Sequence, residues 1–246
     1  DATLLALEAG KPVLCEKPFA INAAQAREMI TCAREKKLFL MEGMWTRFFP
    51  TMIRLRQLVA DGTIGEPRMV TADFGFRAGV DPESRLFNPA LGGGALLDVG
   101  IYPVSFAFMV LGNPTRVASL ATLGETGVDE QAGILFGYEG GELAVLHTAI
   151  RTQTVIEATV LGTEGRIRVH HPMFKPSVLT VSRKGQDEQE ERPYEPEGFQ
   201  FEAQEAASCL RTDKRESEIM PLDESLAIME TLDELRGQWG LKYPME

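Results

Sequence analysis

Three polar side chains combine the types that acid–base chemistry needs: Lys17, Asp98 and Tyr102. Asp98 and Tyr102 follow a run of three glycines, 92–94, in an otherwise mostly apolar stretch of helical character. A regular helix would place these two side chains one turn apart and about 40° around its axis. The glycines would let a ligand or another segment approach the start of this helix. The alternative is a core helix with a half-buried Tyr, and Pro103 predicts a kink at Tyr102.

Lys17 closely follows the short apolar strand predicted for residues 12–15, which ends at Glu16-Lys17-Pro18. In open α/β sheets, ligands bind beyond the carboxyl ends of the strands. A lysine between Glu16 and Pro18 is therefore well placed to reach a ligand, although a surface lysine beside a turn proline is the simpler alternative. The sequence favours a ligand-contacting role.

Two sequence motifs resemble those of the Gfo/Idh/MocA oxidoreductases. Residues 10–18, Gly-Lys-Pro-Val-Leu-Cys-Glu-Lys-Pro, resemble the signature A-G-K-x-V-x-x-E-K-P, and the glycine-rich Asp/Tyr segment resembles the second motif. Many members carry His where this chain has Tyr102. Together with residues 41–50, Met-Glu-Gly-Met-Trp-Thr-Arg-Phe-Phe-Pro, the tyrosine is similar to the branch that contains dimeric dihydrodiol dehydrogenase and NADP-dependent D-xylose dehydrogenase.

This resemblance implies a Rossmann domain, a second domain with an open-faced sheet, and an active site between them. By motif, Lys17, Asp98 and Tyr102 form the catalytic set. We expect Tyr102 to move the hydroxyl proton in step with hydride transfer. A free phenol has a pKa of about 10, and a nearby ammonium would lower it. Lys17 would then bind the substrate oxygen and tune the phenol, and Asp98 would orient Lys17 or the substrate; Lys17 as the acid/base itself is the rival assignment.

Further site residues are expected around these three. Trp45 and Arg47 follow the second parallel strand. The indole could pack against the nicotinamide or substrate, and the guanidinium could bind a hydroxyl or phosphate. Interdomain packing is the alternative for both. Arg77 and, more weakly, Phe76 are candidates for the substrate side. The expected cofactor contacts are Glu16, Lys17, Pro18, Trp45 and Arg47, and the expected substrate contacts are Trp45, Arg77, Asp98 and Tyr102.

The choice between NAD and NADP cannot be read from these residues. No G-x-G-x-x-G follows a strand, and no residue to read the ribose 2′ position is recognisable. The branch resemblance alone favours NADP. We expect the missing phosphate-binding segment upstream of Asp1, and we expect the polypeptide alone to be inactive and poorly soluble.

The predicted elements form two domains, residues 1–44 and 45–246. The first alternates helix 2–9, strand 12–15, a helix capped by Asn22 with Gln25 three residues on, and strand 38–41, as in a doubly wound parallel sheet. The second is α+β, with a mainly antiparallel, open-faced sheet and helices on one face. Its predicted parts are helix 48–60, strands between 67 and 181, loop 78–90, helix 93–111, turns at 138–141 and 162–165, loop 183–198, and helices 199–211 and 222–239.

Composition limits the partners. The net charge is −11 at neutral pH, which disfavours nucleic acid and anionic membranes. No apolar run of the sequence reaches membrane-spanning length. The three cysteines indicate reduced thiols in the cytoplasm, and the three histidines form no metal site, because His170 and His171 point to opposite faces of a strand.

The family resemblance implies a small-molecule substrate, and the sheet pattern suggests a second copy of the chain as the other partner. Strands between 115 and 182 carry apolar residues on both faces, which suits a homodimer. The function that the family resemblance implies is hydride transfer between NAD(P) and a carbinol or hemiacetal carbon of a sugar or trans-dihydrodiol. Inositol-type polyols are the enzymatic alternative, and a non-catalytic sugar- or nucleotide-binding relative is the alternative of another class.

Overall fold

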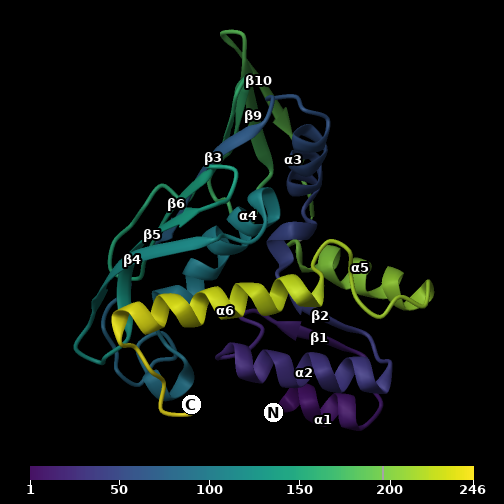
Figure 1. Cartoon of the computed structure of the whole chain (residues 1–246), viewed down its shortest axis with the longest axis vertical. Coiled ribbons are helices and arrows are strands. Elements are labelled where there is room, and N and C mark those ends of the chain that lie inside the picture. The colour runs from purple at the N-terminus through teal and green to yellow at the C-terminus, as the bar shows by residue number, and fades with distance from the viewer. Residues whose placement is uncertain (196) are drawn as a thin grey trace.

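The computed structural model describes residues 1–195 and 197–246 and contains two sheets. The first sheet pairs β1 (Val13–Glu16) with β2 (Leu40–Gly43) in parallel, with Val13 opposite Leu40. Helices α1 (Ala2–Glu8) and α2 (Ala23–Lys36) alternate with these strands and lie together at one end of the molecule (Figure 1). The predicted βαβ arrangement of a Rossmann domain is confirmed.

The start of α2 shows how local sequence produces this unit. The Asn22 side chain accepts a hydrogen bond from the Gln25 N–H at 2.9 Å. The Gln25 side chain in turn accepts one from the Ile21 N–H at 3.2 Å. This capping box satisfies N–H groups that the first helical turn leaves free and fixes where the chain enters α2, five residues after Lys17.

The second sheet has eight strands in the order β10-β9-β8-β7-β3-β6-β5-β4. All neighbouring pairs are antiparallel except β3 and β6, which are parallel with Val70 opposite Ala144. The predicted mainly antiparallel sheet is thus confirmed. Its strands are β3 (Pro67–Gly75), β4 (Arg116–Leu123), β5 (Asp129–Gly137), β6 (Leu143–Ala149), β7 (Ala158–Gly162), β8 (Gly165–Val169), β9 (Val178–Arg183) and β10 (Gln186–Glu191).

Helices cover one face of this sheet and connect it to the first. Helix α6 contacts α2 and β2 as well as β4 and α4, so it crosses from one sheet to the other (Figure 1). The helices of this region are η1 (Trp45–Phe48), α3 (Pro50–Ala60), η2 (Pro89–Leu91), η3 (Leu96–Gly100), α4 (Ile101–Leu111), α5 (Phe199–Arg211) and α6 (Leu222–Trp239).

Two predicted details are wrong. Residues 183–198 were expected to be a loop, but β10 lies within them and pairs with β9. Its charged residues suit an exposed edge strand, and Lys184 and Gly185, both with positive φ, form the tight turn of a hairpin. The helical distortion lies at the π-helical turn η3, immediately before α4 and one turn earlier than the kink expected at Tyr102.

The most apolar helical segment is an internal part of the protein. Contrary to the expectation that no apolar run reaches membrane-spanning length, the stretch Pro89–Leu111 is long and apolar enough to cross a membrane by length and composition, but 78 % of its apolar window is buried inside the structure. Ile101, Val104 and Ala107 are among its fully buried residues. Packing against the sheet therefore accounts for its hydrophobicity.

Candidate active site

Lys17 and Asp98 meet, although they lie 81 residues apart in the sequence. The Lys17 ammonium donates a hydrogen bond to the Asp98 backbone carbonyl at 2.7 Å, and its Nζ lies 3.6 Å from Asp98 Oδ1. The two side chains are only 17 % and 14 % exposed, respectively. Lys17 reaches this position because it directly follows β1, at the carboxyl edge of the parallel pair.

Asp98 also pairs with Arg85, a residue of the loop between β3 and η2. Arg85 Nη1 lies 2.9 Å from Asp98 Oδ1. Burial lowers the pKa of Lys17; the Asp98 carboxylate opposes this, and the Arg85 cation adds to it. Lys17 is thus an ammonium that gives up its proton more readily than an ordinary lysine.

Tyr102 lies beside this pair. The Lys17 Nζ is 4.8 Å from the centre of the Tyr102 ring, and the Trp45 indole N–H donates to the Tyr102 hydroxyl at 2.9 Å. Burial raises the pKa of Tyr102, and the hydrogen bond from Trp45 opposes this rise. The expected lowering by Lys17 is not found in this conformation, because the ammonium faces the ring and the Asp98 carbonyl. Tyr102 is therefore a neutral phenol at physiological pH.

The carboxylate of Asp129 fixes the start of the helical segment that carries Asp98. Its Oδ2 accepts a hydrogen bond from the Leu96 N–H at 2.7 Å. Gly94 has φ +121°, and a Cβ at this position would lie 2.2 Å from Asp129 Oδ1. A glycine is required here because any side chain would displace the carboxylate that caps the turn before Asp98.

A cavity of about 720 Å³ opens beside Lys17. Polar groups and apolar side chains both line it; they include Lys17, Pro18, Phe19, Arg85, Leu97 and Asp98. Pockets of this size hold small ligands and cofactors. Tyr102 and Trp45 are not among the lining residues, and both are buried, with 6 % and 8 % of their surface exposed.

Two predicted site residues lie apart from this group. The Arg47 guanidinium donates to the Ser105 side chain and carbonyl, to the Ile219 carbonyl and to Glu224 Oε1, and its side chain is 3 % exposed. These bonds join η1 to α4 and α6, as in the packing alternative. Arg77 is exposed at the end of β3, and its backbone forms an isolated bridge with Arg151. Neither residue, nor Glu16, lines the cavity beside Lys17.

Two family profiles match the sequence. Residues 1–44 match an oxidoreductase family with an NAD-binding Rossmann fold, and residues 52–168 match the GFO/IDH/MocA C-terminal domain. Human trans-1,2-dihydrobenzene-1,2-diol dehydrogenase is 39 % identical over an alignment of 255 positions, which covers 100 % of this chain and 75 % of the relative. The chain belongs to the Gfo/Idh/MocA oxidoreductase family. The resemblance identified from its motifs is confirmed.

Other members of the family extend this comparison. D-xylose 1-dehydrogenase (NADP(+)) of Hypocrea jecorina is 38 % identical over 275 residues, covering 98 % of this chain and 70 % of the relative. The structure of an aldose-aldose oxidoreductase from Caulobacter crescentus has a TM-score of 0.87 at 26 % identity and covers 97 % of this chain and 73 % of that one. A 3-ketoreductase from Actinomadura kijaniata in complex with NADP and TDP-benzene has a TM-score of 0.84 at 25 % identity, covering 96 % and 73 %.

The site fits the nicotinamide cofactor of this family. The cavity lies at the carboxyl edge of β1, where doubly wound sheets bind dinucleotides, and Lys17 offers it a donor. Phe19 and Leu97 add apolar surface of the kind that packs against a planar ring. Among residues 1–195 and 197–246, no group of three or more His, Cys, Asp or Glu residues is arranged to hold a metal ion.

Sequence reasoning missed several residues of the site. Arg85 could not be singled out because it lies in an irregular loop and contacts Asp98 only through the tertiary fold. An aromatic cluster also surrounds Tyr102 and Trp45: Phe174 stacks on Phe74 at 4.6 Å, and Phe199 stacks on Trp45 at 4.3 Å. The only sequence signal for this cluster is its aromatic composition, which is equally typical of a core.

Proposed function

We propose that the protein transfers a hydride between NADP or NAD and a carbinol or hemiacetal carbon of a sugar or trans-dihydrodiol. The observation that carries this proposal is the contact of Lys17, Asp98 and Tyr102 beside a cavity at the carboxyl edge of β1. The substrate classes come from the dihydrodiol, D-xylose and aldose enzymes among the relatives, and the xylose enzyme favours NADP.

Tyr102 is the proposed acid/base. Because burial keeps its phenol protonated, Tyr102 is suited to donate a proton to the substrate oxygen as a carbonyl is reduced. In the direction of alcohol oxidation it must accept that proton, so the oxidation rate should rise with pH. A nicotinamide held in the cavity beside Lys17 would supply or accept the hydride.

Lys17 and Asp98 serve the same oxygen. We assign the Lys17 ammonium to substrate binding through its free N–H groups, while the carbonyl and carboxylate of Asp98 hold it in place. Lys17 as the acid/base itself remains the rival assignment, supported by its lowered pKa. The two assignments predict different effects of removing the phenol.

The proposed cofactor contacts follow the cavity. Lys17 and Pro18 line it directly, whereas Trp45 acts through its hydrogen bond to Tyr102. We assign Arg47 to the packing of η1 against α4 and α6. We assign no role to Arg77 or Glu16, because neither lines the cavity.

We further propose a homodimer formed by the open face of the large sheet, in the cytoplasm. Leu120, Leu135 and Val145 are 84 %, 43 % and 43 % exposed. Leu135 pairs directly with Val145, and Leu120 pairs with Gly133, two residues before Leu135, so all three lie on one face. Burial of this apolar face in a second copy would remove it from water. The three free cysteines support a reducing compartment.

The test is reduction of NADP and NAD by the full-length protein that contains this chain, against aldoses, trans-dihydrodiols and inositols. We expect turnover with an aldose or a dihydrodiol, and faster reduction of NADP than of NAD. Turnover restricted to inositols would make inositol-type polyols, and not sugars or trans-dihydrodiols, the substrate class. Nucleotide binding without turnover of any alcohol in the panel would instead favour a non-catalytic binding relative.

A further inference from the structure

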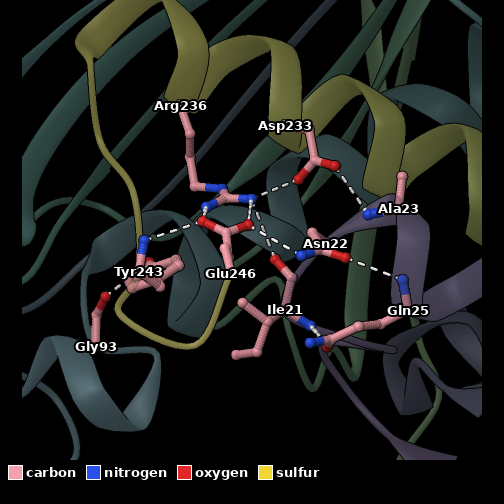
Figure 2. Close-up of polar contacts among 9 residues, drawn as sticks. All are labelled: Ile21, Asn22, Ala23, Gln25, Gly93, Asp233, Arg236, Tyr243 and Glu246. Atoms are coloured by element: carbon pink, nitrogen blue, oxygen red, sulfur yellow. Dashed lines mark hydrogen bonds and ion pairs between the residues drawn. The ribbon is translucent and has the colours of Figure 1, made fainter.

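Helix α6 carries a buried arginine whose bonds extend to several segments around the active site. The Arg236 side chain is 4 % exposed and forms a two-pronged pair with Glu246: Nη1 lies 2.7 Å from Oε2, and Nη2 lies 2.9 Å from Oε1 (Figure 2). These bonds hold the pKa of Glu246 at about 2, so the pair is ionised at any physiological pH. Arg236 also pairs with Asp233 on the same helix.

The cluster of Arg236, Asp233 and Glu246 contacts the segment that follows Lys17. Arg236 Nη2 donates to the Ile21 carbonyl at 3.3 Å, and the Asn22 amide donates to Glu246 Oε1 at 3.1 Å. The Ala23 N–H donates to Asp233 Oδ2 at 2.8 Å (Figure 2). These contacts fix the link between Lys17 and α2, and Ile21 itself lines the cavity beside Lys17.

The same cluster is linked, through Tyr243, to the segment that leads to Asp98. The Tyr243 hydroxyl donates to the Gly93 carbonyl at 2.8 Å, and the Tyr243 N–H donates to Glu246 Oε2 at 2.9 Å. The Arg236 guanidinium lies 5.0 Å from the centre of the Tyr243 ring. Gly93 is five residues before Asp98, so the same arginine is linked to both sides of the Lys17–Asp98 contact.

We propose that Arg236 is a positioning residue that sets the Lys17 ammonium against Asp98 by holding residues 21–23 and, through Glu246 and Tyr243, Gly93. This inference rests on the proposed hydride-transfer function. A planar guanidinium suits the task because its five N–H donors can order several acceptors at once. Displacement of a reacting group by about 1 Å can cost on the order of 100-fold in rate.

The test compares Arg236→Met, Arg236→Lys and Tyr243→Phe in the full-length protein. Tyr243→Phe removes only the hydrogen bond to Gly93 and keeps the ring under the guanidinium. Arg54→Met is the matched control, because Arg54 forms a similar two-pronged pair with Glu190, on α3 and β10 and away from the cavity. The readouts are kcat, KM for the nucleotide, and the pH dependence of acylation of the Lys17 amine, followed by mass spectrometry.

We expect kcat to fall about 10- to 100-fold in Arg236→Met and about 3- to 10-fold in Tyr243→Phe, with KM for the nucleotide changed less than about threefold. Arg236→Lys should recover part of the loss, and Arg54→Met should match the wild type. The acylation profile of Lys17 should move to higher pH in Arg236→Met, because a looser segment is better solvated. Asp98, Arg85 and Glu16, the charged groups that face Lys17, remain unchanged in these variants.

A wild-type kcat together with an unmoved acylation profile in Arg236→Met would overturn the proposal and leave Arg236 with a packing role only. If Arg236→Met does not fold, the same two readouts in Tyr243→Phe and Arg236→Lys decide. The acylation profile needs no substrate. It therefore tests Arg236 even if the wild-type protein reduces no cofactor with the alcohols of the panel, a result that would contradict the proposed function instead.

Discussion

The Lys17 ammonium is the most accessible group of the catalytic set, and its titration is the first property to examine. In carbonyl reduction Tyr102 stays protonated up to high pH, because burial raises its pKa. Lys17 loses its proton earlier than an ordinary lysine, because burial lowers its pKa. Activity that needs the ammonium should therefore fall as pH rises, with a midpoint below the usual lysine value of about 10.4.

Replacing Lys17 with Met should lower kcat/KM for carbonyl reduction by about 100- to 10,000-fold and abolish this alkaline fall. The measurement is kcat/KM from pH 6 to 10 in the wild type and in Lys17→Met. Lys11→Met, an exposed lysine close by in the sequence, is the control. An alkaline fall that persists unchanged in Lys17→Met would assign it to another group.

A substitution of Arg85 tests the titration of Lys17 without removing the lysine. Its cation, held 2.9 Å from Asp98, contributes to the lowered pKa of Lys17. Arg85→Met should therefore raise the pKa of Lys17 and move the alkaline fall of kcat/KM to higher pH. An alkaline fall that is unchanged in Arg85→Met, or moved to lower pH, would contradict a contribution of Arg85 to the lowered pKa of Lys17.

At the level of elements, local signals predicted most of the secondary structure. The Asn22 cap and the turns at 138–141 and 162–165 depend on neighbouring residues only, and the structure places them as expected. The π-helical turn η3 begins at Leu96, whose N–H donates to Asp129, a contact between distant segments that no local signal reveals. The sequence left Arg47 open between a ligand contact and interdomain packing, and its bonds to Ser105 and Glu224 are also contacts between distant segments.

Asp129 makes a prediction about stability. Burial raises the pKa of its carboxyl to about 7 in the folded protein, from an ordinary value near 4. The folded state therefore holds this proton between pH 4 and 7 where the unfolded state releases it, so rising pH costs stability across that range, by roughly 2–4 kcal/mol. Asp129→Asn keeps an oxygen for the Leu96 N–H and should remove this cost.

The measurement is urea unfolding of both proteins at pH 5 and pH 8. We expect the wild type to lose stability relative to Asp129→Asn on going from pH 5 to pH 8. Asp187→Asn, on the exposed strand β10, is the control and should follow the wild type. An equal pH dependence in the wild type and Asp129→Asn would show that Asp129 ionises normally.

For the whole molecule, the open sheet face makes the quaternary prediction. Leu120→Glu places a charge within the exposed apolar strip, on the edge strand β4. It should convert a dimer into monomers, because an interface of this kind buries about 800 Å² per partner and tolerates unpaired charge poorly. Light scattering after size-exclusion chromatography measures this directly. Leu210→Glu, on α5 and 45 % exposed in the wild type, is the control. A monomeric wild type, or a dimeric Leu120→Glu, would contradict the interface.

The central proposal is that Tyr102 moves the proton that accompanies hydride transfer. The most direct measurement is the single-turnover rate of NADP reduction by the full-length protein with Tyr102→Phe, which keeps the ring beside Lys17 and removes the hydroxyl bonded to Trp45. We predict a loss of at least about 100-fold with nucleotide affinity retained. The control is Tyr138→Phe, at a buried tyrosine in the β5–β6 turn, which should turn over normally. A near-normal rate in Tyr102→Phe would contradict the assignment and transfer the acid/base role to Lys17.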